Sequence, residues 1–144
     1  MNVVRTAEVK VDPDTAFRLF TEEMGEWYRS GRWSWNDPER AVGILIEPGV
    51  GGRWLEVWDE ATKEGYELGR VLVWEPGERL VLTYRNVHLP PGDTEVEVRF
   101  EPRGAGTRVT LEHRGVLELP EAQRANAWVN FMTWFRDYAA ARAA

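Results

Sequence analysis

The hydrophobic pattern of the chain changes period twice between its two ends. Residues Val3 to Val11 alternate apolar and polar side chains, which predicts a β-strand. The next segment, DPDTAFRLFTEEMGEWY, offers Asp12 as a helix N-cap and Pro13 at the first helical position, and its apolar residues recur at helical spacing. The N-terminal part is therefore expected to be one strand followed by a short helix.

Period-two alternation returns in the middle of the chain, from about Ile44 to Val116. Turns that contain glycine or proline, such as EPGE and EPRGAG, separate most of the strand-length runs. These runs are GGRWLEVWDE, YELGRVLVWEPG, ERLVLTYRN, TEVEVRFEPRG and GTRVTLEHRGV. Because the connections are short, the strands are expected to pair as antiparallel hairpins.

The last segment, which Pro120 opens, has helical spacing again and predicts a helix of about 20 residues. Trp134 widens its apolar stripe, whose members at i, i+3, i+4, i+7 and i+10 are Trp128, Phe131, Met132, Phe135 and Tyr138. A curved antiparallel sheet wrapped against this helix buries the apolar faces of both. The expected fold class is therefore α+β.

Composition limits the class of protein. The 144 residues suit a single domain spanning 1–144, which can bury a core without disulfides or metals. Cys is absent, which excludes disulfides, thiolate nucleophiles and cysteine-bound metals. The N-terminal segment lacks the features of a signal peptide, and no apolar run is long enough to span a membrane. A cytoplasmic protein is therefore expected.

Charge and reactive residues narrow the choice of partner and chemistry. The net charge is −6 with both signs mixed along the chain, so no basic stripe indicates nucleic acid. The serines, Ser30 and Ser34, lie outside any GxSxG motif, and His88 and His113 lie outside any metal-binding spacing. The sequence therefore predicts neither a hydrolytic triad, nor a metal, nor a cofactor.

Strand parity gathers apolar and aromatic side chains on one face of the predicted sheet. Four polar residues interrupt this face: Glu56, Arg70, Tyr84 and His113. The predicted inward positions are Trp54, Glu56 and Trp58; Tyr66, Leu68, Arg70, Leu72 and Trp74; Leu80, Leu82 and Tyr84; Val96, Val98 and Phe100; and Val109, Leu111 and His113. A few polar groups in an apolar concavity are typical of a small-molecule site. In the alternative interpretation, Glu56 and Arg70 form a cross-strand ion pair, or a β-bulge inverts one strand.

Five stretches follow one another in the order found in a known family. They are VDPDTAFRLFT, EPGVGGRW, GRVLVWEPGERLVLTY, EVEVRFEPRGAGTRVTLEH and AWVNFMTWFRDY. Together they resemble the START-like, helix-grip superfamily, in particular the branch similar to the Aha-type activator of a heat-shock chaperone ATPase. The resemblance implies a cavity between the concave face of a curved sheet and a long C-terminal helix. It is less specific for function, because the superfamily includes ligand carriers, cyclases, hydrolases and a co-chaperone domain.

The aromatic residues on both walls and the resemblance together favour binding of a small apolar or aromatic molecule. The expected cavity residues are Trp33, Trp35, Trp54, Glu56, Trp58, Tyr66, Arg70, Tyr84, His113, Trp128, Phe131, Met132 and Phe135. In the Trp-rich stretch GEWYRSGRWSWNDP, Trp27 is expected to close the helix onto the sheet, and Trp33 and Trp35 to form a lid.

Two other functions stay open at this stage. A chaperone, or a second copy of the chain, would be the partner if Trp27, Trp33 and Trp35 are exposed anchors, because tryptophan is a favoured hot-spot residue. This sequence begins directly with its first strand, whereas the Aha-type activator carries a separate N-terminal domain with a stimulatory motif. An enzyme would use the same cavity, with Glu56 as general acid or base and Tyr84 and His113 as its partners.

Overall fold

The computed structural model describes residues 2–29, 34–89, 91–115 and 121–143 of the chain. In this part, seven strands form one antiparallel sheet in the order β1-β7-β6-β5-β4-β3-β2. The strands are β1 (Val3–Val9), β2 (Gly43–Ile46), β3 (Arg53–Asp59), β4 (Glu64–Glu75), β5 (Arg79–Tyr84), β6 (Thr94–Arg103) and β7 (Gly106–Arg114). The helices are α1 (Pro13–Glu22), α2 (Met24–Trp27), α3 (Glu121–Asn126) and α4 (Val129–Ala143).

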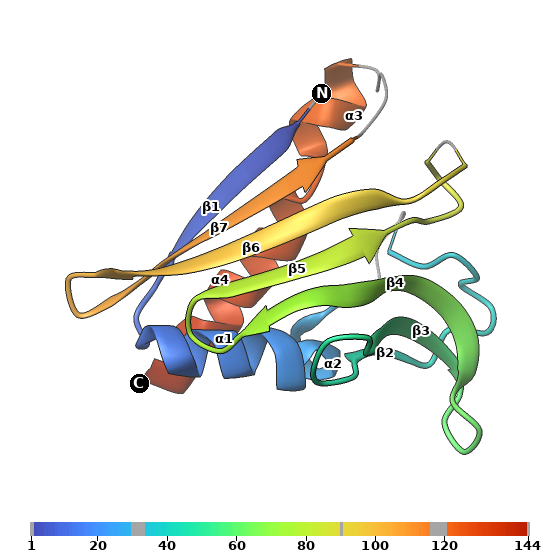
Figure 1. The fold of residues 1–144 in the computed structure, drawn as a ribbon, viewed down its shortest axis with the longest axis horizontal. Helices are drawn as coiled ribbons and strands as arrows, with labels where there is room; N and C mark the ends of the chain where they lie inside the picture. The colour runs from blue at the N-terminus through green and yellow to red at the C-terminus, as the bar shows by residue number, and fades with distance from the viewer. Residues whose placement is uncertain (1, 30–33, 90, 116–120, 144) are drawn as a thin grey trace.

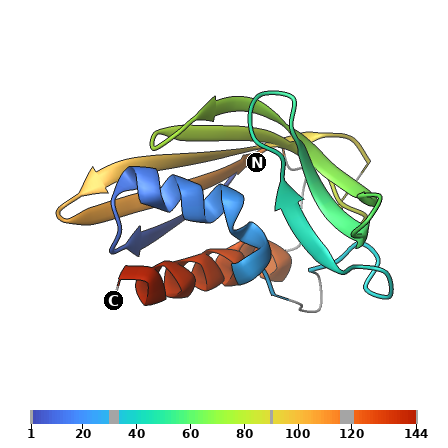
Figure 2. The ribbon, with the colours of Figure 1, turned by 90° about the horizontal axis from the view of Figure 1, so that it is seen from below.

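The sheet is curled, and the helices lie on its concave side (Figures 1 and 2). Helix α4 runs across this side and packs against β1, while α1 packs against β6. The α+β class that the hydrophobic pattern predicted is confirmed, and so is the helix-grip fold that the family resemblance implied.

The N-terminal helix begins where the sequence predicts. The Asp12 carboxylate accepts hydrogen bonds from the Thr15 amide at 3.3 Å and from the Thr15 hydroxyl at 2.5 Å, and Pro13 occupies the first helical position. Helix α2 then brings Trp27 into the core, where its indole nitrogen donates to the Leu19 carbonyl at 3.0 Å. The Trp27 ring packs against Phe20 of α1 and against Phe131 and Phe135 of α4, and its burial excludes it as an exposed anchor for a partner.

Strand parity is confirmed in β5, β6 and β7, whose predicted inward apolar residues are buried. In β4 the prediction is wrong for Arg70 and Leu72, because the pairing register with β3 shifts between the pairs Leu55–Glu67 and Trp54–Gly69. A second shift, between Val71 and Val73 in the pairing with β5, restores the parity, and Trp74 packs against Phe17 of the core as predicted. Val71 is buried between the two shifts, whereas Arg70 and Leu72 are exposed. The β-bulge, which was the alternative interpretation, therefore removes Arg70 from the concave face.

The predicted C-terminal helix is broken into two. Helix α3 ends at Asn126, and α4 begins at Val129. Between them Trp128 has a φ of 66°, the left-handed conformation that usually ends a helix at a glycine. After the break, Phe131, Met132 and Phe135 are buried in the core, as their spacing predicts.

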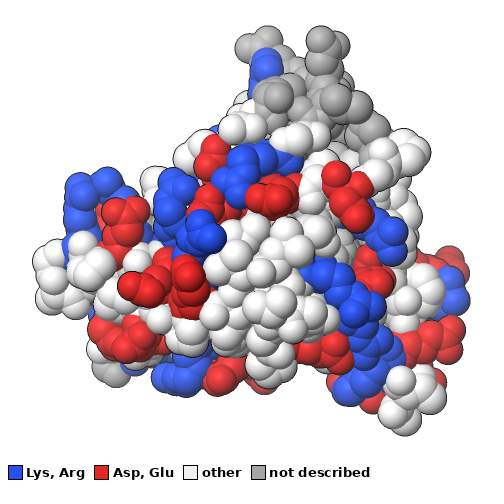
Figure 3. Space-filling model, viewed as in Figure 1, with Lys and Arg blue, Asp and Glu red and all other residues white. Residues whose placement is uncertain are grey.

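Charged residues of both signs share the convex face of the sheet (Figure 3). Glu97 of β6 lies at the centre of this ion-pair network, where Arg114 at 2.6 Å, Arg99 at 3.3 Å and Arg79 at 3.4 Å surround its carboxylate. Burial opposes ionisation of Glu97, but the arginines outweigh burial and lower its pKa.

Among the helices that the structure describes, none is long and apolar enough to cross a membrane.

Candidate ligand-binding cavity

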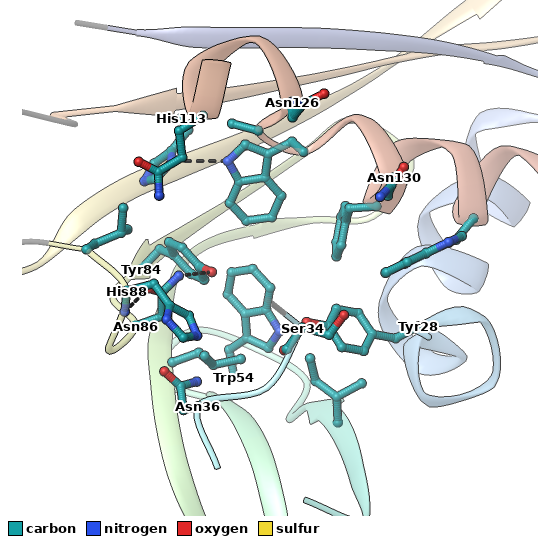
Figure 4. Close-up of a pocket in the computed structure, with 18 residues that line it drawn as sticks. Tyr28, Ser34, Asn36, Trp54, Tyr84, Asn86, His88, His113, Asn126 and Asn130 are labelled. Atoms are coloured by element: carbon teal, nitrogen blue, oxygen red, sulfur yellow. Dashed lines mark hydrogen bonds between the residues drawn. The ribbon is translucent and has the colours of Figure 1, made fainter. Parts of the chain in front are cut away.

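A cavity of about 540 Å³ lies between the concave sheet and the break in the C-terminal helix (Figure 4). Its apolar and aromatic wall consists of Tyr28, Ile44, Trp54, Leu68, Tyr84, Leu89, Ala127, Trp128, Phe131 and Trp134. Its polar wall consists of Ser34, Asn36, Asn86, His88, His113, Gln123, Asn126 and Asn130. Of the lining residues that the structure describes, none is Asp, Glu, Lys or Arg.

Aromatic rings from the sheet and the helix break meet inside the cavity. The Trp54 ring lies 5.0 Å from that of Tyr84 and 6.3 Å from that of Trp128, with 29° between the two indole planes. Trp128 also packs edge-on against Phe131 at 5.1 Å. The left-handed backbone at Trp128 places its indole against the sheet, so the helix break itself builds this wall.

His113 of β7 is hydrogen-bonded at both ring nitrogens. The Trp128 indole N–H can only donate, so Nδ1 of His113 accepts it, at 3.1 Å. Nε2 then carries the proton and donates to the Thr94 hydroxyl at 2.6 Å, which in turn donates to the Tyr84 carbonyl at 2.7 Å. Burial lowers the pKa of His113 to about 4, so the imidazole is neutral near pH 7.

Two loops are joined to each other on the polar side. The side-chain oxygen of Asn36 accepts from the Val87 amide at 2.7 Å. Asn86 donates from its side chain to the Tyr84 hydroxyl at 2.7 Å and accepts from the His88 amide at 2.8 Å. Burial raises the pKa of Tyr84 to about 12, so this hydroxyl keeps its proton.

Glu56 lies beneath the loop that follows Ser34 and does not line the cavity. Its buried carboxylate accepts four hydrogen bonds: from the Asn36 amide at 2.7 Å, the Asn36 side chain at 3.0 Å, the Asp37 amide at 3.0 Å and the Trp58 indole at 2.8 Å. All of these donors are N–H groups of the protein. The arrangement therefore holds the loop in place and leaves the carboxylate no route to a ligand in the cavity.

The structure brings five of the predicted site residues together on the cavity wall: Trp54, Tyr84, His113, Trp128 and Phe131. Met132 and Phe135 are buried in the core beside it. Trp35 packs against Tyr28 with ring centroids 5.0 Å apart, and it is not among the lining residues. Trp33, the other half of the predicted lid, lies outside the described residues.

Three further predicted residues lie away from the cavity: Trp58, Tyr66 and Arg70. The Arg40 guanidinium stacks on the Trp58 ring at 3.9 Å, and that of Arg85 lies 6.0 Å from the Tyr66 ring. Arg70 forms its ion pair with Glu67, so the cross-strand pair with Glu56 that the parity suggested does not form.

The sequence pattern does not predict the amide side chains of the polar wall. Asn36 and Asn86 come from loops, while Asn126 and Asn130 flank the helix break (Figure 4). No periodic pattern connects these four positions, so only the tertiary structure shows that they share one cavity. In the described residues, no group of three or more His, Asp or Glu side chains is arranged to hold a metal ion.

The comparisons with known proteins agree with this architecture. The family model described as "Activator of Hsp90 ATPase homolog 1-like protein" matches residues 10–140. Among curated proteins, no sequence matches the chain significantly.

Several solved structures share the fold. A protein from Mesorhizobium loti is 19% identical, with a TM-score of 0.71 over 100% of this chain and 99% of that one. The Aha1 dimer from Colwellia psychrerythraea is 16% identical, with a TM-score of 0.70 over 97% and 96%. An Hsp90 activator from Plasmodium falciparum is 18% identical, with a TM-score of 0.66 over 90% and 89%. At these identities the structures establish the fold, and the family match over most of the sequence shows that the chain belongs to the activator of Hsp90 ATPase homolog 1-like family.

Proposed function

We propose that this protein binds a small, largely apolar or aromatic molecule in the cavity between the sheet and the C-terminal helix. The observation that carries the proposal is a cavity of about 540 Å³ with an aromatic wall and a few polar groups. Its volume falls within the range of about 300–1,000 Å³ that is usual for small-molecule sites, and its composition is typical of them.

The polar groups support binding rather than catalysis. Both ring nitrogens of His113 are engaged, and its lowered pKa makes it a poor proton acceptor at pH 7. Glu56, the predicted general acid or base, is held by four N–H donors outside the cavity lining. Neither residue is placed to transfer a proton to a bound molecule.

A ligand screen tests the proposal. Thermal-shift measurements and native mass spectrometry against lipids, flavonoids and aromatic metabolites should identify a ligand that raises Tm in proportion to the logarithm of its concentration. Ala127→Leu should weaken this binding, because Ala127 lines the cavity and the larger side chain occupies ligand space. Ala140→Leu adds the same atoms at an exposed position of α4 and should leave binding unchanged. Equal binding by both variants would place the ligand elsewhere and contradict the proposal.

A protein partner is the second candidate, and family membership favours it. Relatives of the same fold are described as an Hsp90 activator and as an Aha1 dimer, so the candidate partners are a chaperone in the cytoplasm and a second copy of this chain. Light scattering on the purified protein would reveal the dimer, and an ATPase assay with added chaperone would reveal activation. A monomer without effect on the ATPase would rule out both.

A further inference from the structure

The indole nitrogen of Trp54 is buried and has no hydrogen-bond partner among the described residues. Leaving such a donor unpaired is costly, because folding removes it from water without replacing the lost hydrogen bond. Trp54 is the central aromatic residue of the cavity wall, and Figure 4 shows its nitrogen on the side where Tyr28 and Ser34 lie. A hydrogen-bond donor inside the candidate site is thus left unused by the protein.

Two polar groups near this ring, His113 and Tyr84, already accept hydrogen bonds from the protein. Nδ1 of His113 accepts from Trp128, and the Tyr84 hydroxyl accepts from Asn86 while its own proton stays available to donate. Trp54 and Tyr84 therefore each offer the cavity a donor that the protein leaves unused. A ligand that complements these two donors presents acceptor atoms.

The charge of the ligand is restricted by the same wall. The described lining contains no Asp, Glu, Lys or Arg, and burial keeps His113 neutral near pH 7. A carboxylate brought into this wall would lose its hydration without gaining a cationic partner, and an ammonium group would gain no carboxylate. Both ionic classes are therefore disfavoured relative to a neutral molecule with the same ring.

Resting on the proposed function, we infer that the cavity takes an uncharged aromatic molecule bearing a carbonyl or similar neutral oxygen, which accepts a hydrogen bond from the Trp54 indole N–H. The rings of Trp54, Tyr84 and Trp128 pack against the aromatic body of the ligand. Because the nitrogen is closed to solvent, the acceptor enters with a small displacement of the side chains that cover it.

Four probes that share one ring system test this inference: naphthalene, 2-acetylnaphthalene, 2-naphthoate and 2-naphthyltrimethylammonium. Calorimetric titration of the wild-type protein should give 2-acetylnaphthalene the lowest Kd. It should bind about threefold to tenfold more tightly than naphthalene, which lacks the acceptor, and at least about tenfold more tightly than either ion. Since the 15N-resolved indole resonance of Trp54 reports on its own N–H, the ketone should shift this resonance downfield of its position with naphthalene.

The matched variants are Trp54→Phe and Trp128→Phe. Trp54→Phe keeps an aromatic ring but removes the unused donor, so the preference for the ketone over naphthalene should disappear. Trp128→Phe removes an indole whose N–H is already bonded to His113, so it should weaken both probes and keep their ratio. If Trp54→Phe does not fold, the wild-type ranking and the indole shift decide the question.

The possible results distinguish failure of the proposed function from failure of the inference about Trp54. Failure of all four probes to bind would argue against an aromatic-binding cavity and so against the proposed function. Binding of naphthalene with no advantage for the ketone would overturn only the inference about Trp54. The same holds if Trp54→Phe keeps that advantage, or if 2-naphthoate or the ammonium probe binds as tightly as the ketone.

Discussion

The indole nitrogen of Trp128 donates to Nδ1 of His113 across 3.1 Å, which joins the break in the C-terminal helix to strand β7. Trp128→Phe would leave that buried nitrogen without its donor. We expect a loss of about 1–3 kcal/mol in the free energy of unfolding, measured by urea denaturation. Trp134→Phe removes the same atoms from a half-buried position in α4 and is the control. An equal loss in both variants would mean that ring size matters and the hydrogen bond does not.

The stability of the protein should depend on pH through His113. Its folded-state pKa is about 4, lowered by burial from the ordinary value of 6.5, so the unfolded chain binds more protons between these values. Stability should therefore fall as pH decreases through this window, by up to about 1.4 kcal/mol per pH unit. Urea denaturation between pH 7 and pH 4.5, in steps of about half a unit, measures this slope.

The window between about pH 6.5 and pH 5.5 isolates the histidine. Glu47, whose pKa its hydrogen bond to Arg53 lowers to about 2, and Glu97, whose pKa the surrounding arginines lower, add to the slope only below about pH 5.5, where these side chains begin to bind protons in the unfolded chain. His113→Phe should abolish the slope between about pH 6.5 and pH 5.5 while lowering stability at pH 7. A wild-type protein equally stable at both ends of this window would refute the assignment.

Glu56 should matter for folding. Glu56→Gln replaces one acceptor oxygen with an NH₂ group that faces N–H donors, so at least one of the four hydrogen bonds is lost and a repulsive contact takes its place. The expected destabilisation is about 1–3 kcal/mol in thermal or urea unfolding. Glu60→Gln, at an exposed ion pair with Lys63, should change stability by less than about 0.5 kcal/mol. If the two variants were equally stable, the structural role of Glu56 would be wrong.

Gly69 should resist substitution because β5 approaches β4 closely at this point. A Cβ atom added there would lie 1.7 Å from the carbonyl oxygen of Thr83, so Gly69→Ala should cost about 2 kcal/mol or more and move the strands apart. Gly43→Ala in β2 meets nothing within 4 Å and should be neutral or stabilising by up to about 1 kcal/mol. Differential scanning calorimetry of the two variants measures the contrast, and a Tm for Gly69→Ala equal to that of Gly43→Ala would contradict it.

The sequence predicts those parts of the fold in which local chemistry and periodicity agree. The start of α1 follows from Asp12 and Pro13, and the inward faces of β5 to β7 follow from strict alternation. The bulge that turns Arg70 outward has no such signal, because it depends on how β4 pairs with both neighbours. The helix break at Trp128 is equally hidden, since neither glycine nor proline marks it.

The candidate site, like the fold, is predicted by the sequence only where its residues belong to regular helices and strands. Alternation and helical spacing identified the aromatic wall, including Trp54 and Trp128, because those positions also belong to regular elements. Parity predicts a reactive role for Glu56 because it gives the face of a side chain and says nothing about its hydrogen-bond partners. Those partners, at Asn36 and Asp37, come from a loop that folds over the strand.

The break between α3 and α4 makes the direction of the side chains in α4 independent of the number of residues in α3. In a continuous helix, each residue inserted before Phe131 would rotate the following side chains by about 100° relative to those upstream. Here the left-handed residue Trp128 resets the backbone, and α4 starts afresh at Val129 with its buried face already set against the sheet. Insertions or deletions within α3 can therefore move Gln123 and Asn126 of the cavity wall while Phe131 and Phe135 keep their places.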